Sequence, residues 1–170
     1  MKELLLDLSH TSHTSANSGI QRVVRSLYES LQTLSNEHEF LVKGITWDPF
    51  AKTWRNLYPS EIKNVIPDPG RRSSRKRRAS WPAVIKIRGH TARWGLSQIP
   101  RLESTDNMGI IFPEIISPNV VDQITRLPVN SCYPKVAIFH DAIPIKFPQL
   151  APKKTVEYFP RYLEFLKTMD

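Results

Sequence analysis

The hydrophobic positions of the chain alternate between short unbroken runs and longer stretches with helical spacing. Residues 2–7 form a short apolar run that ends in an aspartate, which is typical of a buried strand. Residues 20–34 carry apolar side chains every three or four positions, which predicts a helix. Ser18 followed by Gln21 is a capping-box pattern, so we expect this helix to begin at Gly19.

The same criteria predict an alternation of strands and helices along the rest of the chain. We expect strands at 40–47, 109–112 and 135–139, and helices at about 52–58, from Ser117 or Asn119 to about Leu127, and at 153–169. The two clearest strands are continuously apolar, which is typical of parallel strands buried on both faces. The pattern therefore predicts a Rossmann-like α/β domain with a doubly wound parallel sheet.

Doubly wound sheets bind ligands beyond the carboxyl ends of their strands. Two polar clusters stand at such positions, the loop at 9–19 and the pair His140-Asp141. We therefore expect both clusters to face one binding crevice.

The loop at 9–19 leads into the predicted start of the first helix. The free N–H groups of a helix start attract anions, and a glycine allows a phosphate to approach the backbone closely. Ser18, Gly19, Ile20 and Arg22 are therefore candidate ligands of a diphosphate. The alternative is that the serine is only a cap, the glycine a turn and the arginine a solvated helix residue. Neither a dinucleotide-binding glycine motif nor a P-loop is present.

Composition places the chain among cytoplasmic domains. Its 170 residues suit one domain, and its single cysteine, Cys132, excludes an internal disulfide. Acids at Glu3 and Asp7 interrupt what would be the apolar part of a leader peptide, and no apolar stretch approaches the ~18 residues of a membrane span. We expect a cytoplasmic protein.

The net charge of +8 comes from one window. Nine Lys and Arg residues and no acid lie between Arg71 and Arg93, whereas the rest of the chain has 15 basic and 16 acidic residues. Together with the Pro, Gly and Ser content of 67–82, this predicts a basic loop insertion at about 67–95. It is either a solvated loop, or a segment attracted to anionic lipids or an acidic acceptor, or a nucleic-acid contact with Trp81 and Trp94 as stacking residues. No nucleic-acid motif accompanies it, so nucleic acid is the weakest of the three.

The chain offers little for metal or thiol chemistry. His10 and His13 lack a third ligand, so we interpret them as solvated loop residues. No Asp-x-Asp motif occurs, and Cys132 has no nucleophilic partner nearby in the sequence. We expect no metal and no cofactor.

Two segments together resemble a known family. "SGIQRVVRSLYESL" after an Asp-ending strand, and "VAIFHDAIPIKFPQL" about 120 residues later, resemble the N-terminal domain of group 1 (family 4) glycosyltransferases, especially the bacterial mannosyltransferase-like members. The resemblance covers residues 4–35 and 135–170 and is weak or absent across 50–108.

The resemblance implies the N-terminal, acceptor-side half of a GT-B enzyme, with two Rossmann-like domains facing a cleft. Such an enzyme would transfer a hexose such as mannose from a nucleotide-sugar to a glycan or a lipid-linked acceptor, with retention and without a metal. The loop ending at Gly19 would face the donor diphosphate, His140 would lie near the transferred sugar, and Asp141 would orient the loop or bind sugar hydroxyls. Stabilising the leaving diphosphate matters more in this reaction than a strong base.

The donor-binding C-terminal domain of that family is not found in residues 1–170, and the only Glu-x7-Glu spacing, at Glu29 and Glu37, is interpreted as chance. We therefore expect this chain to be an inactive fragment that needs the second domain. The alternatives are a non-catalytic Rossmann-like remnant, or a module that binds membranes or nucleic acid through 71–93. Peripheral association with an anionic membrane is compatible with the first reading as well.

Overall fold

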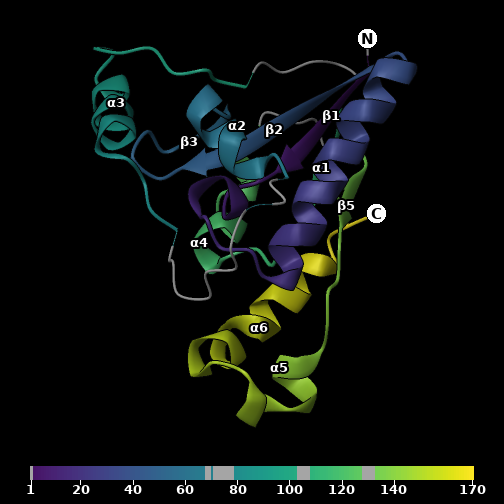
Figure 1. Ribbon diagram of the computed structural model, residues 1–170. Coiled ribbons are helices and arrows are strands. Elements are labelled where there is room, and N and C mark those ends of the chain that lie inside the picture. Colours follow the sequence, from purple (N-terminus) through teal and green to yellow (C-terminus); the bar gives the residue numbers. More distant parts are fainter. Residues whose placement is uncertain (1, 68–69, 71–78, 103–107, 128–132) are drawn as a thin grey trace.

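A five-stranded mixed sheet forms the centre of the molecule in the computed structural model, which describes residues 2–67, 70, 79–102, 108–127 and 133–170 (Figure 1). The strand order is β3-β2-β1-β4-β5. All neighbouring strands are parallel except β3, which pairs antiparallel with β2. The strands are β1 (Lys2–Asp7), β2 (Phe40–Asp48), β3 (Thr53–Asn56), β4 (Met108–Phe112) and β5 (Lys135–Ala137).

Helices connect the strands and cover the sheet. They are α1 (Gly19–Glu37), α2 (Pro59–Val65), α3 (Ala83–Arg93), α4 (Pro118–Val121), α5 (Ile143–Lys146) and α6 (Lys153–Leu166), with 3-10 turns at Thr11–His13, Ile124–Arg126 and Pro148–Leu150. Figure 1 shows α3 at one side of the molecule, well away from α5 at the opposite end.

Each face of the sheet has its own hydrophobic core. Alternate residues of β1 point to opposite faces, so Leu5 packs with α4 and α6 while Leu6 packs with α1 and α2. This double burial explains why the first strand is continuously apolar. The predicted α/β class is confirmed: the sheet is covered on both faces, and it is parallel except for the edge strand β3.

The region between β2 and β4 differs from the sequence-based expectation. The helix expected at about 52–58 is wrong, because 53–56 form the antiparallel edge strand β3. The basic loop insertion expected at about 67–95 is wrong in its second half, because 83–93 form helix α3. Its run at 71–78 lies outside the described residues.

The other predicted elements agree with the structure apart from their ends. Helix α1 begins at Gly19 as expected, and α6 runs through Pro160. The helix expected to reach about Leu127 instead ends at Val121, and a 3-10 turn follows. Within the described part of the chain, no helix is long and apolar enough to cross a membrane.

Candidate functional site at the carboxyl edge of the sheet

The loop after β1 is held against the carboxyl edge of the sheet by one carboxyl group from a distant part of the chain and one at the end of β1 itself. Glu114, which follows β4, accepts backbone N–H bonds from His10 and Thr11, both at 2.8 Å. Asp7 accepts bonds from the amide and hydroxyl of Ser9 at 3.0 and 2.5 Å. A carboxylate that accepts backbone N–H groups is a strong anchor, so this polar loop is ordered and partly buried.

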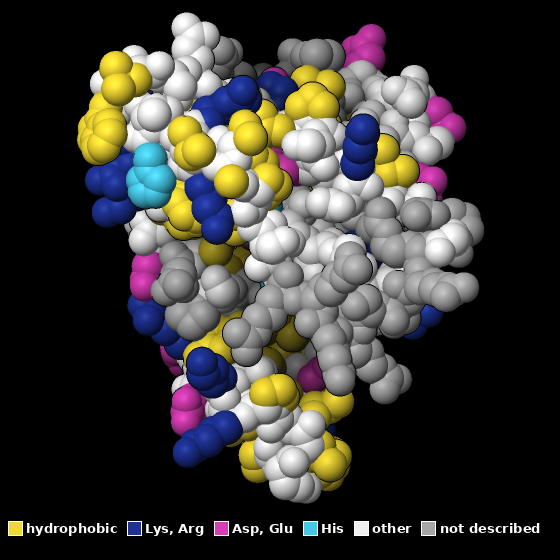
Figure 2. Space-filling model, turned by 60° about the vertical axis from the view of Figure 1, so that its left-hand side comes forward, with side chains coloured by type: hydrophobic (Ala, Val, Ile, Leu, Met, Phe, Trp, Pro, Cys, Tyr) yellow, Lys and Arg dark blue, Asp and Glu magenta, His cyan; other side chains and the backbone are white. Residues whose placement is uncertain are grey.

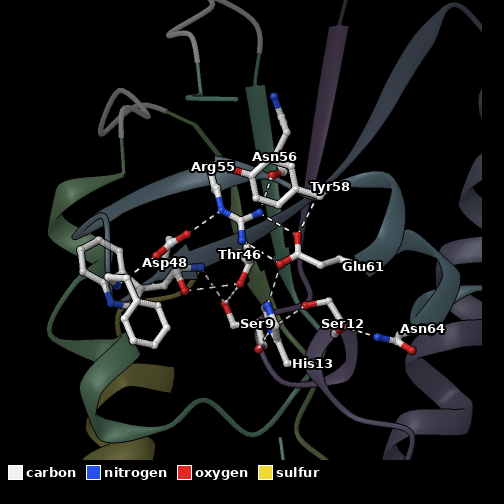
Figure 3. A network of polar contacts seen from close by, with 12 residues as sticks. Ser9, Ser12, His13, Thr46, Asp48, Arg55, Asn56, Tyr58, Glu61 and Asn64 are labelled. Atoms are coloured by element: carbon white, nitrogen blue, oxygen red, sulfur yellow. Dashed lines mark hydrogen bonds and ion pairs between the residues drawn. The ribbon is translucent and has the colours of Figure 1, made fainter. Parts of the chain in front are cut away.

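A network of buried charges fixes the other side of the loop (Figure 3). The His13 Nε2 lies 2.8 Å from Glu61 Oε1, and Arg55 donates two bonds of 2.7 Å to the same Glu61 carboxylate. Arg55 also donates from Nε to Asp48 at 2.8 Å. The guanidinium therefore bridges the end of β2 and helix α2, and the imidazole links the loop to helix α2.

Both ring nitrogens of His13 face acceptors. Nε2 faces the Glu61 carboxylate, and Nδ1 lies 2.9 Å from the backbone oxygen of Ser9. Nδ1 also lies 3.0 Å from the hydroxyl of Ser12, so both ring nitrogens have hydrogen-bonding partners. A buried polar network that is satisfied in this way fixes the orientation of its members.

The pKa of Glu61 reflects this pairing. Burial alone would raise it, but the hydrogen bonds from Arg55 and His13 outweigh burial and hold the pKa at about 2. Glu61 also accepts the backbone N–H of Tyr58 at 2.8 Å. This carboxylate is therefore ionised throughout the neutral range and serves as an anchor.

A hollow of about 240 Å³ opens at the carboxyl edge next to this network. Two carboxyl groups, Asp7 and Glu114, line it together with the indole rings of Trp47 and Trp81, and the other lining residues are Ser9, His10, Pro49, Ala79, Ile115, Ile116, Ser117 and Val120. We call this space the carboxyl-edge hollow. It combines hydrogen-bonding groups with flat apolar surfaces, as ligand sites do.

Asp7 is almost completely buried at the end of β1. Burial raises the pKa of Asp7 to about 7, with a further contribution from the negative charge of Glu114. Near neutral pH this carboxyl group is thus present in both forms, and it can donate or accept a hydrogen bond in the hollow.

A second, polar hollow of about 320 Å³ lies on the other side of His13. The ring of His13 stacks on Trp81 with centroids 3.6 Å apart, so this ring pair stands between the two hollows. Hydroxyl groups dominate its lining, from Ser12, Thr14, Ser15, Ser60 and Ser80, with His13, Glu61, Asn64 and Pro82.

The predicted diphosphate ligands lie at the start of α1. Ser18, Gly19 and Arg22 are exposed and Ile20 is half-buried. The Ser18 amide donates to the Gln21 side chain at 3.2 Å, and a Cβ at Gly19 would meet no atom within 4 Å. The backbone there is accessible, yet none of these four residues is among those lining the two hollows.

The second predicted pair follows β5. The Nε2 of His140 lies 2.8 Å from the backbone oxygen of Pro113, so this ring links the ends of β4 and β5. Asp141 is exposed, and its carboxylate accepts the N–H of Ile143 at 3.0 Å, which caps helix α5. Strand topology puts both residues at the same edge as the loop, although neither lines the two hollows.

The interpretation of His13 as a solvated loop residue is wrong, because its side chain is buried, hydrogen-bonded to Glu61 and stacked on Trp81. His10 is exposed, as expected. Cys132 lies outside the described residues. Among the residues that are described, no group of three or more His, Cys, Asp and Glu side chains is arranged to hold a metal ion.

Sequence reasoning missed the acids that organise the site. Glu114 stands two residues after an apolar strand, and Glu61 falls at the third position of a helix that begins with proline. The position of Glu114 beyond a strand end was a usable signal. The convergence of Arg55, Glu61 and His13 had no local signal, because β3 itself was not predicted.

The comparisons with known proteins leave the family open. No protein-family model, no curated protein and no solved structure matches the chain.

Proposed function

We propose that this domain binds a sugar in the carboxyl-edge hollow and is the acceptor-side, Rossmann-like half of a GT-B glycosyltransferase. One observation carries the proposal: two buried carboxyl groups and two indole rings line one hollow at the carboxyl edge of a mostly parallel sheet. The resemblance of residues 4–35 and 135–170 to family 4 glycosyltransferases supplies the enzyme class.

The chemistry of the lining suits a pyranose. Sugar hydroxyls donate to carboxylates, and the C–H face of the ring packs on an indole. Asp7 and Glu114 supply the acceptors, and Trp47 and Trp81 supply the apolar surfaces. The hollow, at about 240 Å³, is at the small end of ligand sites, which suits one sugar ring better than a whole nucleotide-sugar.

The donor would lie outside this hollow, against the start of α1. The accessible backbone at Gly19 and the exposed Arg22 are suited to a diphosphate that gains charge as the sugar leaves. In this proposal the hexose comes from a nucleotide-sugar held mainly by a second domain, and no metal is needed. His140 and Asp141 would border the cleft at the end of β5.

Binding of simple sugars to the 170-residue chain tests the proposal without requiring turnover. Saturation-transfer NMR with a panel of hexoses, including mannose, glucose and galactose, is expected to show binding for at least one of them. Trp81→Ala is expected to abolish that signal, because the variant removes one apolar wall of the hollow. Trp94→Ala is the matched control, since Trp94 is exposed and does not line the hollow.

Because Trp81 also stacks on His13, a second variant keeps the test independent of folding. Asp7→Asn keeps the size of the side chain and the oxygen that accepts both bonds from Ser9 but removes the charge, and at about pH 8 it is expected to weaken the same sugar at least several-fold while the circular dichroism spectrum stays unchanged. If no hexose binds the native chain, or if Trp94→Ala lowers the signal as much as Trp81→Ala, the proposal is refuted.

A further inference from the structure

Helix α3 has one face against the body of the protein and one face turned outward. Its inner face consists of Ile85, Gly89 and Ala92. A Cβ at Gly89 would lie 2.7 Å from the Phe50 Cβ and 3.0 Å from the Ala51 amide nitrogen, so the helix backbone lies directly on the turn after β2. This contact determines which side chains of the helix point outward.

Four large apolar residues of this segment are exposed, and we call them the apolar row. Val84 and Ile87 lie three positions apart on one helix face, and Trp94 and Leu96 follow just beyond the helix end. Each of the four side chains is at least 64% exposed. Isolated exposed apolar residues are ordinary, but a contiguous group of this kind usually marks an interaction surface.

The charged residues from 79 to 102 are all basic. Lys86, Arg88, Arg93 and Arg101 are exposed, and no acid occurs anywhere from 79 to 102. Figure 2 shows hydrophobic and basic side chains intermixed over the side of the molecule where α3 lies. We call this surface, formed by Val84, Lys86, Ile87, Arg88, Arg93, Trp94 and Leu96, the α3 surface.

We propose that the α3 surface docks onto an anionic lipid bilayer. A short amphipathic helix that lies in the interface buries its apolar side chains among the acyl chains, while its Lys and Arg side chains remain with the negative headgroups. Tryptophan is favoured at that depth because its ring is apolar and its N–H reaches water. Helix α3 is about 16 Å long by the rise of an α-helix, so it lies along the membrane and does not span it.

The apolar row decides between a bilayer and a nucleic acid. Nucleic acids attract cations and stack on aromatic rings, but they offer nothing to exposed valine, isoleucine and leucine side chains. A bilayer uses the cations and the aliphatic side chains together. The inference therefore assigns the membrane contact to side chains of α3, independently of the basic run at 71–78 and of the proposed sugar site.

Co-sedimentation of the 170-residue chain with lipid vesicles tests this assignment. The native chain is expected to bind vesicles of phosphatidylcholine with about 30% phosphatidylglycerol and to bind pure phosphatidylcholine vesicles at least about tenfold more weakly. Ile87→Ser/Trp94→Ser is expected to lower the partition coefficient on the anionic vesicles at least about tenfold, with an unchanged circular dichroism spectrum.

A matched control removes apolar side chains at a distant site. Ile145→Ser/Leu150→Ser changes two exposed residues near α5, at the opposite end of the molecule, and is expected to leave vesicle binding unchanged. Lys86→Gln/Arg93→Gln is expected to weaken vesicle binding at about 0.1 M salt. At about 0.5 M salt the difference from the native chain is expected to be smaller, because the charges are screened.

Three results would overturn the assignment. Undiminished vesicle binding by Ile87→Ser/Trp94→Ser would assign the contact to other parts of the chain. Binding of the native chain to DNA oligonucleotides but not to anionic vesicles would make the surface a nucleic-acid contact. If the native chain dimerises and does not bind vesicles, and Ile87→Ser/Trp94→Ser is monomeric, the α3 surface is an interface between copies of this chain.

Discussion

Asp7 is a buried carboxyl group whose ionisation opposes folding. The perturbation we consider is Asp7→Asn, which keeps the size of the side chain and an oxygen acceptor for the amide and hydroxyl of Ser9. It removes only the titratable proton and the negative charge that Asp7 would carry beside Glu114. The variant therefore isolates the free energy of holding that charge inside the protein.

The size and sign of the effect follow from the pKa of Asp7. The ordinary value is 3.8, and the folded value is about 7. Between these values the folded protein keeps a proton that the unfolded chain has released, so the free energy of unfolding falls as the pH rises through this window. At about 1.4 kcal/mol per pH unit, the total loss is about 4 kcal/mol as an upper bound. Glu61 contributes a slope of the opposite sign between its folded pKa of about 2 and its ordinary value of 4.5, so its contribution is nearly complete at about pH 5 and changes little above that pH.

Urea unfolding followed by circular dichroism, at intervals from about pH 5 to about pH 8, measures the difference. The stability of Asp7→Asn relative to the native chain is expected to rise by up to about 3 kcal/mol from about pH 5 to about pH 7, because about two pH units of the window lie there, and to stay constant above the folded pKa of about 7.

Asp48→Asn is the matched control, because Asp48 is an equally buried aspartate at the end of the neighbouring strand and is paired with Arg55. It is expected to be less stable than the native chain by about 3 kcal/mol throughout that range. A stability difference between Asp7→Asn and the native chain that does not change with pH would refute the reasoning.

Two further predictions concern packing and charge. Glu61→Gln leaves Arg55 and His13 without their shared carboxylate in the interior, and we expect it to lower the free energy of unfolding by about 3 kcal/mol, measured by urea titration. Gly89→Ala places a methyl group 2.7 Å from the Phe50 Cβ, and we expect a loss of about 1–3 kcal/mol in thermal unfolding. At Gly19 the same methyl group meets open space, so Gly19→Ala is expected to cause no loss of stability in thermal unfolding. An equal loss of stability in both alanine variants would contradict the close contact at Gly89.

Part of the site could be located from the sequence by position alone. Two parallel strands place their carboxyl ends at one edge, so the loop after β1 and the residues after β5 were expected together there, and the strand topology agrees. The hydrogen-bond partners of those residues could not be inferred from the sequence. His140 binds the carbonyl of Pro113, and Asp141 caps a short helix, both through partners that the linear pattern does not reveal.

The hairpin of β2 and β3 shows why the edge strand at 53–56 was not predicted. Its turn has no Asn-Gly or Asp-Gly signal, and Lys52 adopts a positive φ of 53° that is uncommon for a residue with a side chain. Asp48 compensates by accepting the amides of Phe50 and Ala51, each at 2.9 Å. Such a turn depends on a specific side chain, so the composition of the segment does not reveal it.

The sequence by itself determined the α/β class, helix α1 with its start at Gly19, and the continuously apolar inner strands, because these depend on local periodicity and capping. Only the tertiary structure decided which polar residues meet. Glu61 lies 48 positions from His13, and Glu114 lies 104 positions from His10, so their contacts depend on how the sheet orders its strands. The carboxyl-edge hollow and the outward face of α3 arise in the same way, because burial is a property of the packed chain and is not encoded in any short segment.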